Sequence, residues 1–235
     1  MDLRKYKVLS FDCYGTLIDW DAGLTTQLKR IAPDFEGDDL LQRYSVFEAE
    51  IEREHPTTLY SDVVTQAAKQ LAESLDREIS DALAADIGGS VGEWPPFDDS
   101  VEALAELRKH CDLVVLSNVD RTSFMGSSTQ LGDPFHSVIT AEDVGSYKPA
   151  AKNFEALLAH IDEMGVNRSE HLHVAQSLFH DHAPAKELGI DSLWINRRTG
   201  KDSEGASGPA LDVTPDAEYP DMASFTAALV AAKSG

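Results

Sequence analysis

Four polar side chains in the sequence have the types needed for covalent catalysis followed by a water-dependent step. Asp12 follows an apolar stretch, where a carboxylate can attack an electrophilic carbon or phosphorus atom and form an ester. Lys148 could keep that carboxylate ionised, because a nearby positive charge lowers a carboxyl pKa. Thr16 could hydrogen-bond the carboxylate, and Asp181 could orient or activate a water molecule. We therefore predict that Asp12, Thr16, Lys148 and Asp181 are catalytic.

Each of these residues also has a structural alternative. Asp12 and Asp181 could cap a turn or a helix, and Thr16 could cap the segment that follows it. Lys148 could be a solvated loop residue. One such residue alone would be weak evidence, whereas the four together favour the chemical interpretation.

Seven further residues are predicted to contact a substrate: Tyr14, Arg43, Ser117, Asn118, Gln176, Ser177 and Phe179. Ser117 and Asn118 are neutral donors that could hold an anionic group or hydrogen-bond within their own loop. Arg43 has a fixed set of donors that suits a carboxylate, although a solvated arginine is the default on an amphipathic helix. Phe179 could line an apolar pocket or pack locally.

Apolar stretches that end at these motifs predict the strands that position them. We expect strands at residues 6–11, 112–118, 171–177 and 191–196, and a helix at residues 100–110. Strands separated by helices indicate a parallel sheet, and reactive groups gather outside the carboxyl ends of parallel strands. Asp12, Ser117 and Gln176 would then lie at one edge of the sheet.

The block from residue 21 to residue 94 has helical periodicity. Leu40, Tyr44, Phe47 and Ile51 recur at intervals of three and four residues, as expected for one face of a helix. A glycine cluster and the sequence Trp-Pro-Pro at residues 94–96 end the block. We expect a helical cap domain at residues 21–94, inserted into a core formed by residues 1–20 and 95–235.

The motifs resemble those of a known superfamily. FDCYGTLIDW, LSNVD, YKP and VAQSLFHDHAPAKELG occur in the order and approximate spacing of the four motifs of haloacid dehalogenase (HAD) superfamily hydrolases, and together they span the whole chain. The resemblance implies an α/β fold, with a Rossmann-like parallel-sheet core and an inserted helical cap domain. It also implies that Asp12 is the nucleophile. The DxYGT pattern is similar to that of the type II (S)-2-haloacid dehalogenases in particular.

Two substitutions indicate the substrate class and the cofactors. The phosphatases of the superfamily place an acidic residue two positions after the nucleophile, where this chain has Tyr14. An alkoxide leaving group needs a general acid, whereas a halide leaves without a proton. Gln176 replaces a carboxylate that would bind Mg²⁺, so we expect no metal and no other cofactor.

The resemblance therefore implies hydrolysis of short 2-haloalkanoic acids to 2-hydroxy acids through an aspartyl ester on Asp12. The alternatives are a phosphatase and a non-catalytic small-ligand-binding protein on the same fold. The chain departs from the dehalogenase pattern at Phe154, where those enzymes usually carry tyrosine, and in motif four at Ala175, Gln176 and Ser177.

Composition excludes several other classes. The 41 acidic and 20 basic residues give a net charge of −21, which argues against nucleic acid or an anionic membrane as a partner. No apolar run of membrane-spanning length and no signal peptide occur, so we expect a soluble, cytoplasmic protein. Its expected partner is a small 2-haloacid substrate, and the chain could also form a homodimer. The two cysteines are expected to pack as small hydrophobic residues. Residues 197–215 are predicted to form a mobile surface loop.

Overall fold

The computed structural model describes residues 1–199 and 213–235, and these residues form a six-stranded sheet. The strand order is β3-β2-β1-β4-β5-β6, and every neighbouring pair is parallel. The strands are β1 (Val8–Phe11), β2 (Asp112–Ser117), β3 (Ser137–Thr140), β4 (His171–Ala175), β5 (Ser192–Ile195) and β6 (Ala217–Tyr219). The predicted parallel α/β sheet is confirmed, with β1 at its centre beside β2 and β4.

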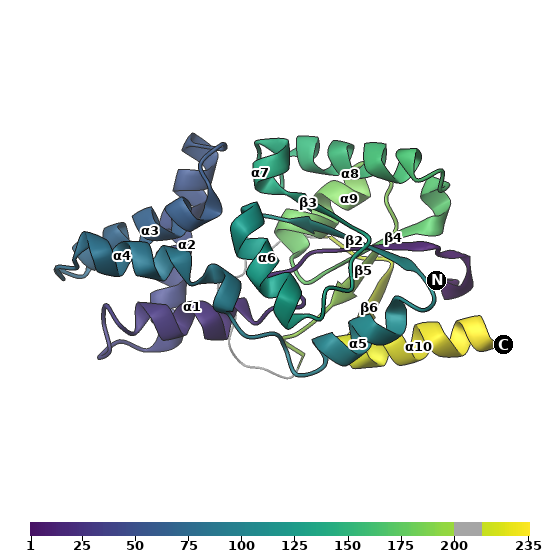
Figure 1. Cartoon of the computed structure of the whole chain (residues 1–235), viewed down its shortest axis with the longest axis horizontal. Helices are drawn as coiled ribbons and strands as arrows, with labels where there is room; N and C mark the ends of the chain where they lie inside the picture. Colours follow the sequence, from purple (N-terminus) through teal and green to yellow (C-terminus); the bar gives the residue numbers. More distant parts are fainter. Residues whose placement is uncertain (200–212) are drawn as a thin grey trace.

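Helices cover both faces of the sheet (Figure 1). α8 (Ala151–Glu163) and α9 (Ala183–Glu187) lie on one face, and α5 (Ser100–Leu107) and α10 (Met222–Ser234) lie on the other. Alternate residues of β1 divide between these layers, since Val8 packs with Leu157 while Leu9 and Phe11 belong to the cluster that contains Phe225. The strand period of two therefore decides which polar side chains of the sheet face α8.

The shorter elements connect these layers. α6 (Arg121–Gln130) follows β2, and α7 (Ala141–Val144) follows β3. Short helical turns occur at η1 (Leu3–Lys5), η2 (Val91–Glu93), η3 (Arg168–Glu170) and η4 (Leu178–His182), of which η4 is a single π-helical turn. It carries the predicted catalytic residue Asp181, and such turns often occur at functional sites.

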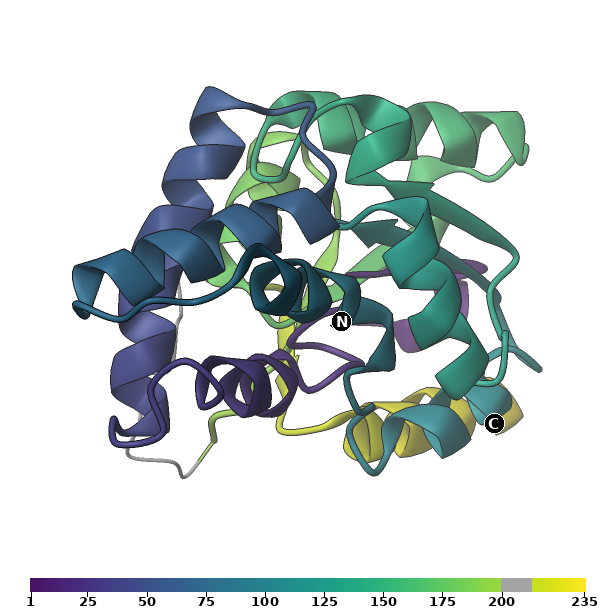
Figure 2. The same ribbon diagram turned by 60° about the vertical axis from the view of Figure 1, so that its left-hand side comes forward.

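Helices α1 (Trp20–Leu28), α2 (Gly37–Glu54), α3 (Tyr60–Ser74) and α4 (Asp81–Gly89) lie together at one end of the molecule (Figures 1 and 2). α2 buries Leu40, Leu41, Tyr44 and Ile51, which include most of the predicted periodic positions. This group is called the four-helix segment from here on. Its interpretation as a separate cap domain stays a prediction.

Both cysteines are free and buried, as the sequence analysis predicted. Among the described residues, no helix is long and apolar enough to cross a membrane.

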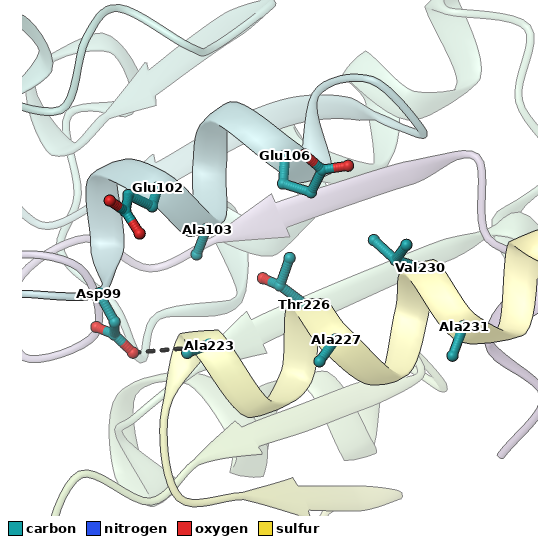
Figure 3. A pocket seen from close by; sticks show the side chains of 9 residues that line it. All are labelled: Asp99, Glu102, Ala103, Glu106, Ala223, Thr226, Ala227, Val230 and Ala231. Carbon is teal, nitrogen blue, oxygen red and sulfur yellow. Dashed lines mark hydrogen bonds between the residues drawn. The ribbon is translucent and has the colours of Figure 1, made fainter.

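A groove of about 470 Å³ runs between α5 and α10 (Figure 3). Ala103, Ala223 and Val230 line it, Asp99 stands at one end, and none of the predicted site residues takes part. The groove is therefore separate from the four motifs.

Two adjacent glycines in α4 allow a test of the packing between α3 and α4. A Cβ atom at Gly88 would overlap Thr65 Oγ1 and the Ser61 carbonyl oxygen, whereas a Cβ at the exposed Gly89 would meet no atom within 4 Å. We expect Gly88→Ala to lower the free energy of unfolding by about 1–3 kcal/mol through overpacking. Gly89→Ala should leave it unchanged or raise it by up to ~1 kcal/mol, because alanine favours helix. Urea unfolding measures both, and equal effects would contradict this contact.

Candidate active site

The chain turns sharply after β1 and brings Thr16 back to Asp12. The Asp12 amide donates to the Val174 carbonyl at 3.1 Å, which continues the sheet by one residue. Gly15 has a φ of 88°, a conformation that glycine adopts without strain. Thr16 Oγ1 then donates to Asp12 Oδ2 at 2.6 Å, and Asp12 is only 7% exposed. The carboxylate is thus fixed in orientation at the end of the central strand.

Thr16 also joins the first motif to the fourth. The backbone amide of Gln176 donates to Thr16 Oγ1 at 2.9 Å, so the threonine hydroxyl uses both its hydrogen and its oxygen. Trp194 Nε1 donates to the Gln176 carbonyl at 2.8 Å and holds this backbone segment in place. These contacts position the loop, while the Gln176 side-chain oxygen lies beside Gly15.

Arg197 also holds the turn that contains Thr16, a role that was not predicted from the sequence. Its Nε and Nη2 atoms donate to the Thr16 carbonyl at 3.1 and 2.9 Å, and its Nη1 atom pairs with Asp99 at 2.8 Å. The prediction of a mobile surface loop is therefore wrong at Arg197, whose side chain is only 9% exposed. Residues 200–212 of that predicted loop lie outside the described residues.

Lys148 lies between two carboxylates. Its Nζ atom donates to Asp12 Oδ1 at 2.9 Å, to Asp181 Oδ1 at 2.7 Å and to the Leu116 carbonyl at 3.0 Å. These three bonds use the full donor capacity of an ammonium group. Burial by itself would lower the pKa of Lys148, but the two carboxylates outweigh it and raise the pKa above its ordinary value. Lys148 is therefore a permanent buried cation.

The two carboxyl groups respond differently to burial. Burial opposes the charge of Asp181, but Lys148 and a hydrogen bond from His173 outweigh it and lower the pKa of Asp181. Burial raises the pKa of Asp12, and the charge of Asp181 adds to this, while Lys148 and Thr16 oppose it. Asp181 Oδ2 is buried and has no hydrogen-bond partner among the described residues. Asp181 is thus held as an anion, and Oδ2 is its candidate acceptor for a hydrogen bond from a ligand or water.

Asn118 and Ser117 have different roles in the structure. Asn118 Oδ1 accepts from the Lys148 amide at 2.7 Å, and its Nδ2 donates to the Lys148 carbonyl at 3.0 Å. Asn118 therefore positions Lys148, although it was predicted to bind substrate. Ser117 Oγ is buried without a hydrogen-bond partner in the described part of the chain, so it stays a candidate for substrate binding.

Tyr14 occupies the position at which a phosphatase would carry its general acid. Its ring packs edge-on against Trp94 at 5.9 Å and near Tyr60 at 6.5 Å, and its hydroxyl lies 2.7 Å from Ser127 Oγ. Burial raises the pKa of Tyr14 well above its usual range. The ring of Tyr14 therefore packs among other aromatic side chains, and its hydroxyl already has a hydrogen-bond partner in Ser127.

The remaining residues of motif four are local. Ser177 Oγ caps η4 by accepting from the His180 amide at 3.0 Å. Phe179 packs edge-on against His180, with ring centroids 4.9 Å apart. The structure thus gives Ser177 a capping contact and Phe179 a packing contact, and a substrate contact for either stays a prediction.

Arg43 is not brought into this cluster. Its side chain is 48% exposed, pairs with Asp39 at 3.1 Å one turn away, and lies over the ring of Phe35. Nine residues further along α2, Glu52 lies close enough to Lys148 for the lysine charge to oppose the rise in its pKa. Nine residues correspond to two and a half helical turns, so Arg43 and Glu52 project from opposite sides of α2. The residue of α2 whose charge interacts with that of Lys148 is thus the acidic Glu52, whereas the sequence had predicted the basic Arg43 near the site.

Glu48 and Glu52 belong to an acidic and aromatic group in the four-helix segment. Tyr60 donates to Glu48 Oε1 at 2.8 Å, and Trp20 Nε1 donates to the Tyr60 hydroxyl at 3.1 Å. Burial raises the pKa of Glu48 to about 7 and raises the pKa of Glu52 well above its usual range. These residues were not predicted from the sequence, in which the only signal for them was an acidic position beside the apolar face of α2.

The donor set does not fit a divalent cation between the two aspartates. The ammonium of Lys148 already bridges Asp12 and Asp181, and Gln176 offers an amide in place of a carboxylate. No group of three or more His, Cys, Asp or Glu side chains that could hold a metal ion occurs within residues 1–199 and 213–235.

Comparisons with known proteins agree with this architecture. The chain is 29% identical over 112 residues to the rhythmically expressed gene 2 protein of Drosophila melanogaster, a match that covers 45% of this chain and 43% of that relative. The chain thus spans less than half the length of this curated relative.

Solved structures match over nearly the whole chain. The L-2-haloacid dehalogenase from Xanthobacter autotrophicus with chloropropionic acid covalently bound has a TM-score of 0.80 and 19% identity, covering 96% of this chain and 98% of that one. The L-2-haloacid dehalogenase RSc1362 has a TM-score of 0.80 and 22% identity, covering 96% and 99%. These likenesses show the fold. The model of the haloacid dehalogenase-like hydrolases matches residues 6–205, and the chain belongs to this family of hydrolases.

Proposed function

We propose that this hydrolase removes halide from short 2-haloalkanoic acids by covalent catalysis at Asp12 and releases 2-hydroxy acids. The observation that carries the proposal is the aromatic side chain of Tyr14 beside the nucleophile, with its hydroxyl committed to Ser127. Tyr14 offers no proton to the first leaving group, which suits a leaving group that needs none. Halide meets that condition, because it is the conjugate base of a strong acid.

The first step is displacement at carbon. A carboxylate oxygen of Asp12 forms a bond to C2 of the substrate as the bond from C2 to the halogen breaks, and the halogen leaves with the electron pair. Thr16 and Lys148 hold the carboxylate in one orientation during the attack. The substrate is then joined to Asp12 as a neutral ester.

The second step is ester hydrolysis. A water molecule adds to the carbonyl carbon of the Asp12 ester. Asp181 Oδ2, which has no hydrogen-bond partner in the described part of the chain, accepts a proton from that water. The bond between the carbonyl carbon and the substrate oxygen then breaks, and the departing oxygen takes up the proton held by Asp181 to give the hydroxy acid. The proton left on the Asp12 carboxyl group is released as the carboxylate forms again. The balance is one water consumed, with one halide and one proton released.

Phosphate ester hydrolysis is the weaker candidate. It needs a proton for an alkoxide leaving group and usually a metal ion to neutralise the phosphate, and neither Tyr14 nor Gln176 supplies these functions. The covalent adduct in the Xanthobacter dehalogenase supports the first candidate, because that protein has the same fold. Ser117, whose buried hydroxyl has no hydrogen-bond partner within residues 1–199 and 213–235, is the proposed contact for the substrate carboxylate.

The covalent step can be tested by isotope transfer. In a single turnover in heavy-oxygen water with excess chelator, the label should enter Asp12 and not the hydroxy acid, because water attacks the ester carbonyl. Mass spectrometry of the peptide and of the product measures both. Asp12→Asn should stay folded and lose nearly all halide release. Label in the product of the first turnover would show direct attack by water, and dependence on added Mg²⁺ would contradict a metal-independent site.

The acids of α2 predict a pH dependence that differs between charged and neutral substrates. Glu48, with its pKa raised to about 7, is neutral at lower pH and becomes an anion as the pH rises through that value. We expect kcat/KM for 2-bromopropionate to fall by about fivefold across this range, which corresponds to the ~1 kcal/mol repulsion between two nearby charges in water. The neutral 2-bromopropionamide should show no such fall.

Glu48→Gln should remove the difference between the two substrates and keep the oxygen that accepts from Tyr60. The matched control is Glu50→Gln, since Glu50 is exposed on the same helix. A fall in kcat/KM that is equal for the acid and the amide, or one that persists in Glu48→Gln, would show that these acids do not act on the substrate.

A further inference from the structure

A buried group of polar side chains next to Asp181 has no role in the two steps as described above. Ser10 of β1 and His171 and His173 of β4 are fully buried, and Ser10 pairs with His173 in the register of the two strands. His171 and His173 are two residues apart, so both project from the same face of the sheet. Phe154 of α8 packs edge-on against His173 at 5.5 Å, which places the group between the sheet and α8.

The group forms a continuous chain that ends at Asp181. Ser10 Oγ lies 2.7 Å from His171 Nε2 and 2.8 Å from His173 Nδ1. His173 Nε2 lies 3.0 Å from Asp181 Oδ1, the oxygen that also accepts from Lys148. One serine hydroxyl thus connects two imidazole rings, and the second ring contacts a carboxylate of the site.

The positions of the hydrogens in this series of hydrogen bonds follow from His171, at the end away from Asp181. Burial lowers the pKa of His171 to about 3, so this ring is neutral and has one N–H. Its Nδ1 atom is buried and has no hydrogen-bond partner among the described residues. A buried N–H without an acceptor is rarer in proteins than an acceptor without a donor. The hydrogen therefore lies on Nε2 and is donated to Ser10.

Each further bond then has one direction. Ser10 Oγ accepts from His171, so the hydroxyl hydrogen of Ser10 is donated to His173 Nδ1. With Nδ1 acting as an acceptor, the hydrogen of the His173 ring lies on Nε2 and points to Asp181 Oδ1. The edge contact with Phe154 restricts rotation of the ring.

We propose that His173 is a positioning residue for Asp181, with its tautomer fixed by Ser10 and His171. Two donors, Lys148 and His173, meet at Asp181 Oδ1 and fix the rotation of the carboxylate. Oδ2 is then the oxygen left to accept a proton from the hydrolytic water. The inference rests on the proposed function, since it assigns His173 to the ester-hydrolysis step and not to the attack by Asp12.

Ester formation and ester hydrolysis can be measured separately in the full-length chain with 2-bromopropionate. In His173→Leu we expect ester hydrolysis to slow by about tenfold or more, the effect of losing a hydrogen bond to a charged group, while ester formation changes little. The Asp12 ester should therefore accumulate and be visible by mass spectrometry. Asp181 interacts with Lys148, Asp12, His173, His180 and His182. The variant removes only the hydrogen bond from His173, which favours the charged form of Asp181, so the pH at which hydrolysis is half-maximal should rise.

Two milder variants keep the test valid where His173→Leu fails to fold. His173→Gln can place an amide N–H near the position of Nε2 and should restore most of the hydrolysis rate. Ser10→Ala should slow hydrolysis without slowing ester formation. The matched control is Ser137→Ala, because Ser137 Oγ lies 2.6 Å from His160 Nε2 in the same sheet but outside the site. Equal slowing of both steps, or no slowing in any variant of this group, would overturn the proposal.

A second measurement needs no substrate. Nitrogen chemical shifts of the imidazole rings report which nitrogen carries the hydrogen, and both His171 and His173 should be protonated at Nε2 alone. Ser10→Ala should change the spectrum of His173, whereas Ser137→Ala should not. A hydrogen on His173 Nδ1 in the unchanged protein would overturn the inference. A protein with the expected tautomers that forms no Asp12 ester would instead overturn the proposed function.

Discussion

The site depends on the ion triad in which Lys148 joins Asp12 and Asp181. Two carboxylates of this degree of burial would not both stay ionised without a cation, because burial and their mutual repulsion raise the carboxyl pKa. Removing one partner from a buried ion pair typically costs about 3–5 kcal/mol, since the remaining charge is left uncompensated. The ammonium is itself placed by the Leu116 carbonyl and by the two amide contacts of Asn118. The carboxyl ends of β1, β2 and β4 must therefore meet at one edge for the triad to form.

Much of this arrangement could be predicted from sequence because it depends on local features. An apolar run followed by a polar motif defines a strand end, and parallel strands bring such ends together, so Asp12, Ser117 and Gln176 could be grouped at one edge of the sheet. Lys148 and Asp181 were grouped with Asp12 through the resemblance of their motifs to those of the superfamily. β3 and β6 were not predicted, because they have four and three residues and are partly exposed, so neither forms an apolar run. The structural role of Arg197 was also missed, since its partner is the carbonyl of Thr16, far away in sequence.

The orientation of α2 in the four-helix segment could not be predicted from its sequence pattern. The apolar periodicity of α2 identified its buried face, but Arg43 and Glu52 lie at opposite edges of that face, and the pattern does not say which edge turns toward Lys148. That choice is made by tertiary packing, including the contacts of Trp20 and Tyr60 around Glu48. The histidines of β4 posed the same problem, because their role depends on Ser10, a residue of a different strand.

The charge balance of the buried site favours a reaction that removes a negative charge from it. Before reaction, Lys148 faces the carboxylates of Asp12 and Asp181, so the triad has one excess negative charge in a region of low polarity. In the proposed reaction, attack by Asp12 would convert its carboxylate into a neutral ester and transfer the charge to a halide that can leave. The triad then reduces to one pair, Lys148 and Asp181, whose charges cancel. A phosphate monoester would bring a larger negative charge beside Asp181 than a 2-haloacid does, so this charge balance suits the proposed substrate class better.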